Sequence, residues 1–263
     1  GTYGEWHYWG FFYLPDLGPA MTEHFRTFVA RQYATPAALS AAWGRTVRSF
    51  AAVEVPGRER LRTGNGFLRQ GQDAAWVRDY VTCHHRLVAD TLIDCCRTVK
   101  QASDNRLLAG AFHGYFFNTP WRDEAGHLEF RRVVDSPWVD YLAAPQVYDV
   151  ASRDIGGTAL DRALVAAVRR RGKLWFSEAD TPTHIGRSMK VYWKTREEIA
   201  LTAADSIAIV RRDAARAFAE DHALWWFDFG RDYLGGEYLD PQVMAEIARL
   251  AAADRRLDML RPE

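Results

Sequence analysis

Short apolar runs alternate with helical patterns in the second half of the chain, and this alternation limits the folds open to it. Four runs bounded by turn residues predict strands, at 106–116, 139–148, 174–176 and 223–227. Helical patterns separate and follow them, at 128–134, 159–170, 199–217 and after Pro241. Strands that alternate with helices favour an α/β fold with a parallel sheet and right-handed crossovers.

The first half of the chain is mainly helical in pattern. Pro19 and Pro36 each open a predicted helix, and the range 73–103 predicts the longest one. The buried stripe of this longest helix is predicted at Val77, Val81, His84, Val88, Leu92, Cys95 and Val99. The range 45–72 is rich in Gly and Arg, and we expect a long loop there with one short strand near 52–55.

The length of 263 residues suits one large α/β domain, so we expect residues 1–263 to form a single domain. The 34 basic and 34 acidic residues cancel, which argues against a nucleic-acid or membrane partner. No apolar run approaches the roughly 20 residues of a membrane span. The three cysteines, Cys83, Cys95 and Cys96, are expected to be reduced thiols. The sequence leaves the compartment open, with the cytoplasm favoured.

The range 173–181, KLWFSEADT, carries the strongest functional signal in the chain. Its apolar residues predict a short buried strand that releases two carboxylates, Glu178 and Asp180, at its end. In parallel α/β folds, ligands bind at the carboxyl ends of the strands. We therefore expect both carboxylates to point into a binding crevice. The alternative is that they begin an exposed loop.

Polar or aromatic side chains end the other predicted strands in matching positions. They are His113, Tyr115, Gln146, Tyr148, Trp225, Trp226 and Asp228. At the opening of the chain, Glu5 and Trp6 form a comparable group, which we interpret as the tail of a further strand. The two glutamates, Glu5 and Glu178, can then face each other across a crevice lined by aromatic rings.

Two opposed carboxylates with aromatic walls are what glycoside hydrolysis requires: one proton donor, and one nucleophile or base. The chain is rich in rings, with 10 Trp, 11 Tyr and 14 Phe, and such rings stack on the apolar faces of sugars or fill cores. No nucleotide fingerprint appears, and His84 and His85 are adjacent on a helix and point apart. We therefore expect no cofactor and no metal.

The sequence resembles the β-galactosidase-like (β/α)8 glycoside hydrolases of the large retaining clan, in particular relatives of family 42. The segments that carry the resemblance, in the family's order, are GEWHYWG, FRTFVARQYATPAALSAAWG, LLAGAFHGYFF, VDYLAAPQVYD, KLWFSEADTPTH and ALWWFDFG. The resemblance implies an acid/base at the end of the fourth barrel strand, Glu5, and a nucleophile at the end of the seventh, Glu178. Relatives usually carry Asn immediately before the acid/base, where this chain has Gly4.

The resemblance also implies the roles of several aromatic and polar residues. Tyr148 would contact the nucleophile, and Trp225 or Trp226 would form the floor of the sugar site. Together with the residues at the strand ends, the expected substrate contacts are Trp6, His113, Tyr115, Tyr148, Asp180, Trp225, Trp226 and Asp228.

The fold implied by the resemblance is a partial TIM-type (β/α) barrel, from the end of strand four to strand eight. A catalytic domain that is N-terminally incomplete in this way leaves sheet edges unpaired. We expect a homodimer or higher homo-oligomer, or extra segments such as 45–72, to cover them.

The function implied is that of a retaining exo-glycosidase, β-galactosidase-like, which hydrolyses terminal β-linked sugars with two glutamates. Two alternatives stay open. One is a carbohydrate-binding or structural half-barrel without turnover. The other is a half-barrel that works only when paired with another chain.

Overall fold

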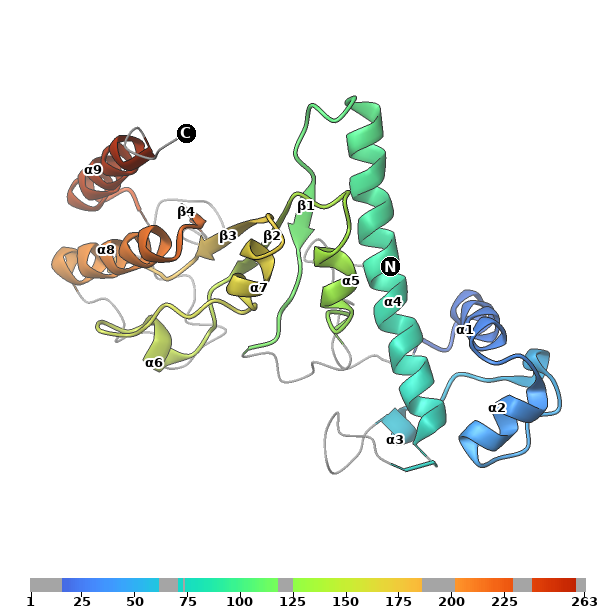
Figure 1. Cartoon of the computed structure of the whole chain (residues 1–263). Helices are drawn as coiled ribbons and strands as arrows, with labels where there is room; N and C mark the ends of the chain where they lie inside the picture. The colour runs from blue at the N-terminus through green and yellow to red at the C-terminus, as the bar shows by residue number, and fades with distance from the viewer. Residues whose placement is uncertain are drawn as a thin grey trace. The chain divides into compact units, whose positions relative to one another are not determined.

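The computed structural model describes residues 16–61, 71–72, 74–117, 125–185, 202–228 and 238–258 (Figure 1). The chain divides into two compact units. The first comprises Gly1–His113 and Thr119–Val139, and the second comprises Gly114–Asn118 and Asp140–Glu263. The α/β class expected from the sequence is confirmed, because four strands alternate with helices along the described chain.

The first unit is mainly helical. Its elements are α1 (Pro19–Gln32), α2 (Pro36–Trp43), η1 (Phe50–Ala52), α3 (Arg58–Leu61), α4 (Ala75–Ala102), β1 (Gly110–Phe112) and α5 (Phe130–Val134). Proline occupies the first turn of α1 and of α2, as predicted, and the side chain of Thr35 caps α2 by accepting from the amide of Ala38 at 3.1 Å. Phe25, Leu39 and Trp43 are among the residues that form the core between these helices and α4.

Helix α4 confirms the predicted longest helix, but its buried stripe differs from the prediction. Val77, His84, Val88 and Leu92 are buried as expected, whereas Cys95 and Val99 are exposed. The buried positions toward its C-terminal end are instead Cys96 and Lys100. The buried positions from Val88 onward recur every four residues, and each such step turns the buried face by about 40° around a helix of 3.6 residues per turn, so the buried stripe leaves the predicted positions.

The region between α2 and α4 also differs from the prediction. Residues 50–52 form the short 3-10 helix η1, and the amide of Val53 donates to the carbonyl of Phe50 at 3.1 Å. No strand occurs in the described part of this region, so the strand expected near 52–55 is wrong. Its apolar residues Val53 and Val55 are buried against the helices of the first unit instead.

The second unit carries a parallel sheet with helices. Its elements are β2 (Tyr141–Pro145), α6 (Val150–Arg153), α7 (Val165–Arg169), β3 (Leu174–Ala179), α8 (Ala203–Glu220), β4 (Ala223–Trp226) and α9 (Pro241–Asp258). Strand β3 lies between β2 and β4 and runs parallel to both. Glu178 is in register with Pro145 on one side and with Trp225 on the other.

The boundaries of several predicted strands need correction. Strand β1 is shorter than the predicted 106–116, because Asp104 and Asn105 turn the chain in left-handed conformations and Leu107 stays exposed. Strand β3 is longer than predicted and extends to Ala179. Glu178 therefore lies inside the strand rather than beyond it.

The long helix before β4 starts later than predicted. The sequence Thr195-Arg196-Glu197-Glu198 predicts a capping box before this helix, and these residues lie outside the described ones. The structure has a capping box at Thr202, whose hydroxyl oxygen accepts from the amide of Asp205 while the Asp205 carboxylate accepts from the amide of Thr202. The apolar spacing of the sequence predicts an inner face at Ile199, Ala203, Ile207, Val210, Ala214 and Ala217. This face is confirmed at Val210, Ala214 and Ala217, which are buried.

The two faces of β3 have different surroundings, because successive side chains of a strand point to opposite sides. One face carries Trp175, Ser177 and Ala179, all of which are buried. The other face carries Leu174, Phe176 and Glu178. Leu174 is 48% exposed and Phe176 is half-buried, so this second face is only partly covered by the described residues.

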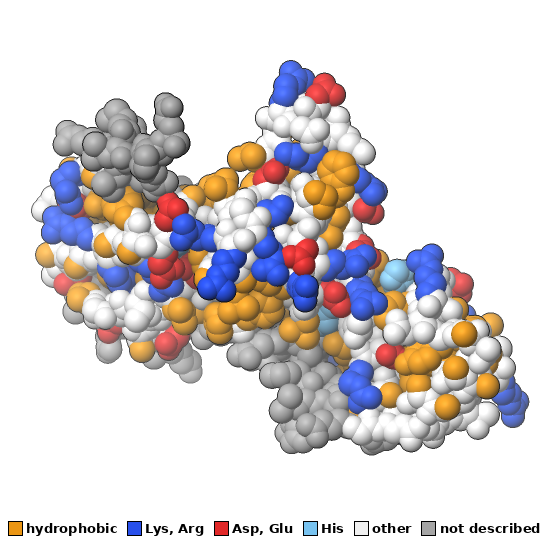
Figure 2. All heavy atoms as spheres, viewed as in Figure 1, with side chains coloured by type: hydrophobic (Ala, Val, Ile, Leu, Met, Phe, Trp, Pro, Cys, Tyr) orange, Lys and Arg blue, Asp and Glu red, His pale blue; other side chains and the backbone are white. Residues whose placement is uncertain are grey.

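The surface of the molecule carries charges of both signs. On the face shown in Figure 2, basic and acidic side chains are interspersed. This distribution agrees with the equal numbers of basic and acidic residues in the sequence. None of the described helices has both the length and the apolar character that a membrane span requires.

Candidate active site

Glu178 lies one residue before the carboxyl end of β3, the central strand of the three in the second unit. The backbone carbonyl of Glu178 accepts a hydrogen bond from the amide of Gln146 at 3.1 Å, which ties it to the chain just after β2. Its side chain is buried, with 7% exposed. The sheet therefore fixes the backbone of Glu178 at the edge where parallel sheets bind ligands.

Aromatic rings occupy the same face of the sheet as Glu178. The Phe176 ring lies 5.1 Å from the Tyr141 ring of β2 and 6.1 Å from the Trp225 ring of β4, measured between centroids. Trp225 is directly in register with Glu178. Because these rings are half-buried, they form an apolar wall that begins at the glutamate.

Asp180, two residues after Glu178, is engaged in a buried ion pair. Its carboxylate accepts from the Arg153 guanidinium and, at 2.5 Å, from the Tyr148 hydroxyl. Arg153 also donates to the carbonyl of Val147 at 2.8 Å. The side chains of Asp180 and Arg153 are 0% and 1% exposed. Burial, reinforced by the Asp180 charge, raises the pKa of Tyr148, so the phenol stays protonated and donates.

A second arginine connects Tyr148 with Tyr115. The Arg162 guanidinium lies 4.2 Å from the centroid of the Tyr148 ring and 5.2 Å from that of Tyr115. The carbonyl of Arg162 accepts from the amides of Phe116 and Phe117. Two predicted substrate contacts, Tyr115 and Tyr148, are thus brought together on one guanidinium through cation–π contacts.

Polar side chains of α8 form hydrogen bonds with the segment that follows β2. Asp213 of α8 accepts from Arg212 at 2.8 Å and from the side chain of Gln146. Arg212 in turn donates to the carbonyl of Arg153 at 2.8 Å. Burial raises the pKa of Asp213. These bonds link the body of α8 to the strand ends that carry Tyr148 and Glu178.

His113 follows β1 in the first unit, so it belongs to a different compact unit from Glu178. Its ring is fully buried and stacks on the ring of His127, with 4.6 Å between centroids. Burial, with a smaller contribution from His85, lowers the pKa of His113 to about 3, so the ring is neutral at pH 7.

The remaining predicted site residues occupy different environments. Trp226 points to the face opposite Glu178, where it packs against α8 and α9. Asp228 follows β4 and is half-buried. The predicted acid/base Glu5 and its neighbour Trp6 lie outside the described residues. The predicted roles of all these residues stay predictions.

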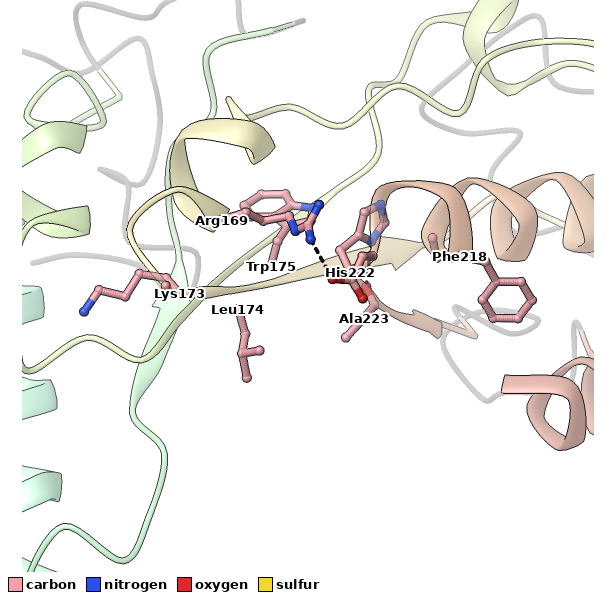
Figure 3. Close-up of a pocket in the computed structure, with 10 residues that line it drawn as sticks. Arg169, Lys173, Leu174, Trp175, Phe218, His222 and Ala223 are labelled. Carbon is pink, nitrogen blue, oxygen red and sulfur yellow. Dashed lines mark hydrogen bonds and ion pairs between the residues drawn. The ribbon is translucent and has the colours of Figure 1, made fainter. Parts of the chain in front are cut away.

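A cavity of about 420 Å³ opens at the opposite edge of the same sheet (Figure 3). It is lined by Leu174 and Trp175 at the start of β3 and by Ala223 at the start of β4. Ligands of parallel sheets bind at the carboxyl ends of strands, so this cavity is not the place where a substrate of Glu178 would bind.

Sequence reasoning missed the two arginines that organise the site, Arg153 and Arg162. It also missed a group of three potential metal ligands near the cavity, namely Asp161, Glu220 and His222. The sequence contains no signal for the arginines, since Arg153 at the end of the short helix α6 and Arg162 after it look like any exposed arginine. The three ligands are far apart in the chain, so no spacing motif reveals them.

No protein-family model matches the sequence, and no curated protein matches it. Solved structures do match the fold. The catalytic domain of β-amylase from Paenibacillus polymyxa superposes with a TM-score of 0.53 at 16% identity, covering 85% of this chain and 54% of that one. An exo-β-agarase superposes with a TM-score of 0.55 at 17% identity, covering 90% of this chain and 31% of that one.

A third solved structure, β-galactosidase from the psychrophilic Marinomonas ef1, gives a TM-score of 0.54 at 16% identity. The match covers 91% of this chain and 37% of that one. The chain thus spans about a third to a half of the three proteins. At this level of identity the similarity shows the fold alone: a part of the TIM-type barrel of glycoside hydrolases, to which this chain is distantly similar.

Proposed function

We propose that this chain is a retaining exo-glycosidase that hydrolyses terminal β-linked sugars, with Glu178 as the nucleophile and Glu5 as the acid/base. The observation that carries the proposal is the position of Glu178. Its carboxylate is buried at the carboxyl end of the central strand, on the face that also carries Phe176 and Trp225. β-Galactosides are the first substrates to test, because the sequence resembles β-galactosidase-like enzymes.

The proposed reaction is a double displacement. Glu178 attacks the anomeric carbon while Glu5 protonates the leaving oxygen, which gives a glycosyl ester on Glu178. Glu5 then takes a proton from water, which attacks the anomeric carbon and releases the sugar and the Glu178 carboxylate. The half-buried Trp225 ring, in register with Glu178, offers an apolar surface to one face of the sugar.

The polar residues around Asp180 act as positioning groups in this proposal. Tyr148 and Arg153 hold the Asp180 carboxylate, and the same stretch of backbone carries Glu178 two residues earlier. Retention requires the carboxyl groups of Glu5 and Glu178 to lie about 5 to 5.5 Å apart, whereas inversion requires roughly 6.5 to 9.5 Å. An experimental structure that resolves residue 5 measures this separation directly.

Hydrolysis of a panel of nitrophenyl β-glycosides by the full chain tests the proposal. We expect Glu178→Gln to lower kcat/KM by roughly 10³-fold or more, because the amide cannot form the glycosyl ester. The matched control is Glu23→Gln, which removes a glutamate side chain that is 72% exposed on α1. The control should keep full activity. Equal activity of the Glu178 variant and the parent would overturn the assignment.

Azide distinguishes the nucleophile from the acid/base. In Glu178→Ala, azide enters the vacated space, attacks the anomeric carbon as the aryl oxide leaves, and gives a glycosyl azide of inverted configuration. In Glu5→Ala, azide should instead attack the glycosyl ester on Glu178 and give the retained configuration. The opposite pattern would exchange the two roles.

A second candidate function is carbohydrate binding without turnover. It is favoured by the limited length of the match, since the chain spans 54% or less of each compared structure. A folded parent that binds sugars but does not hydrolyse any glycoside would support this function. Binding that is unchanged in Glu178→Gln would support it further.

A further inference from the structure

Three side chains with metal-binding atoms converge beside the amino ends of β3 and β4. They are Asp161 from the segment between β2 and α7, Glu220 at the last position of α8, and His222 directly before β4. One ligand atom from each lies within 4.8 Å of the other two. This is the only group of three or more such residues found among the described part of the chain.

The orientation of His222 is that of a metal ligand. The Nδ1 atom lies 3.1 Å from the carbonyl oxygen of Ala223, so it carries the proton and donates to that oxygen. The Nε2 atom then presents its lone pair, and it lies 3.8 Å from both Asp161 Oδ2 and Glu220 Oε2. Ligand histidines are commonly fixed in this way by a backbone carbonyl.

One buried atom of this group, His222 Nε2, lacks a hydrogen-bond partner among the described residues. The side chains of His222 and Asp161 are each 1% exposed. Asp161 Oδ1 is satisfied, because it accepts from the indole nitrogen of Trp175 at 3.1 Å. Asp161 Oδ2 has an ion pair with Arg216 at 3.2 Å. Buried polar atoms are normally hydrogen-bonded, so the lone pair of His222 Nε2, which faces two carboxylates without a bond, indicates a place for a ligand.

The electrostatic balance of the group favours a cation. Two carboxylates, Asp161 and Glu220, face one guanidinium, that of Arg216, which leaves one negative charge in excess when His222 is neutral. Glu220 is also the last residue of the 18-residue helix α8, whose C-terminal end carries a partial negative charge.

We propose that Asp161, Glu220 and His222 form a binding site for a divalent transition-metal cation, with Zn²⁺ as the ion best suited to the ligands. One imidazole and two carboxylates are a nitrogen–oxygen set that Zn²⁺ accepts, with a water molecule as the fourth ligand. Bond lengths of about 2.0 to 2.2 Å place tetrahedral ligands about 3.3 to 3.6 Å apart. The two separations from His222, 3.8 Å each, require a small contraction. The carboxylates of Asp161 and Glu220, whose ligand atoms lie within 4.8 Å of each other, must draw closer by up to about 1.5 Å.

Arg216 is the competitor of the ion in this proposal. Its NH2 group lies 3.2 Å from Asp161 Oδ2 and 3.2 Å from Glu220 Oε1, so it must withdraw from both carboxylates when the ion enters. Its other terminal nitrogen donates to the carbonyl of Thr158 at 2.7 Å, and the side chain can keep this hydrogen bond when it leaves the carboxylates.

The proposed metal site opens into the cavity at the amino ends of β3 and β4. His222 and Trp175 both line the 420 Å³ cavity, where Figure 3 shows them between the start of β3 and the end of α8. A bound ion would join the segment around Asp161 to the end of α8. This site is separate from Glu178, which lies at the other edge of the sheet, so it does not depend on the proposed glycosidase function.

The test is titration of the tag-free full chain with ZnCl₂ by calorimetry, together with the visible absorption of Co²⁺ as a readout of tetrahedral coordination. We expect one equivalent to bind to the parent. His222→Gln should weaken binding by roughly 100-fold or more and abolish the Co²⁺ bands. The matched control, His24→Gln, removes an exposed histidine of α1 and should leave both unchanged.

Two further variants keep the test decisive if His222→Gln does not fold. Glu220→Gln changes a side chain that is 42% exposed, and it should weaken Zn²⁺ binding without disturbing the core. Arg216→Gln removes the competing guanidinium and should tighten binding. Absence of Zn²⁺ binding by the folded parent at millimolar ion would overturn the proposal, as would binding that is unaffected by all three variants.

Discussion

Two aspartate–arginine pairs of the second unit differ in burial, and burial determines how much an ion pair contributes to folding stability. The pair of Asp180 and Arg153 is almost fully buried, whereas the pair of Asp221 and Arg169 has 46% and 41% of its side chains exposed. An exposed pair contributes little because water and salt screen it. A buried pair costs much to break, since the remaining charge is left without a partner.

We predict that Asp180→Asn destabilises the fold by about 3 to 5 kcal/mol, because it leaves the buried Arg153 guanidinium without its counter-charge. Asp221→Asn is the matched control, and it should cost less than about 1 kcal/mol. Urea denaturation of both variants at pH 7 measures the two free energies of unfolding. Equal effects would contradict the role given to burial.

At this scale the sequence predicts where residues lie relative to the strands better than it predicts what they touch. Glu178, Asp180 and Tyr148 were selected because they end predicted strands, and the structure places all three near the ends of β2 and β3. The partners of Asp180 were not predictable, since Arg153 lies 27 positions away and nothing in its sequence context marks it as buried. Trp225 and Trp226 are adjacent, and only the register of β4 shows which one shares the face of Glu178.

At the scale of elements, the contact between α8 and α9 is reinforced by one carboxylate. Glu246 of α9 accepts from Arg211 of α8 at 2.8 Å and from Arg249 at 3.0 Å. Hydrogen bonds from Arg249 and Arg211 lower the pKa of Glu246 to about 2 from its ordinary value of 4.5. A carboxyl group with a lowered pKa in the folded state stabilises that state only while it is ionised.

The pH dependence of stability follows from this shift. The contribution of Glu246 is complete above about pH 4.5 and is lost as the pH falls toward 2. We predict that Glu246→Gln lowers the free energy of unfolding by about 1 kcal/mol at pH 7, since both arginines are mostly exposed. The difference between parent and variant should shrink between pH 4.5 and 2. A constant difference over this range would rule out the linkage.

The elements themselves were largely predictable, and the errors have local causes. Helices that begin with proline, such as α1 and α2, were found from their first residues. Strand β1 was overestimated because apolar Leu107 and Leu108 look like strand residues but are exposed before it. Strand β3 was underestimated because Ser177 and Glu178 are polar, although their backbone continues the ladder.

At the scale of the whole molecule, the fold matches part of larger barrels. Among the described residues, no strand pairs with the side of β4 that faces away from β3. Such an edge invites pairing with another chain. We therefore propose, as expected from the sequence, that the chain forms a homodimer or higher homo-oligomer.

We predict that light scattering coupled to size-exclusion chromatography gives a mass of at least twice 30.0 kDa at micromolar concentration. If the active site needs both copies, activity per chain should rise with protein concentration, because dilution dissociates the assembly. A monomeric mass with activity independent of concentration would contradict this prediction and would support a half-barrel that works alone.

The alternation of strands and helices was sufficient to predict the α/β class, because short apolar runs between helical patterns favour a parallel sheet with helices. The partial barrel was implied by the resemblance to β-galactosidase-like glycoside hydrolases. The arrangement of Asp161, Glu220 and His222 was not predictable. It arises only when the segment after β2 and the end of α8 meet beside β3.

The two-faced character of β3 also determines where this chain can change in length during evolution. One residue inserted within β3 would turn the side chains on one side of the insertion to the other face, which brings either Glu178 toward the helices or the Trp175 ring toward the open side. Just before the strand, Gly172 adopts a left-handed conformation, and a Cβ there would meet nothing within 4 Å. Residues 169–172 are exposed, so an inserted residue at this turn can project into solvent. Length variation can therefore accumulate at the sheet edge opposite the carboxylate, while the edge that carries Glu178 keeps its spacing.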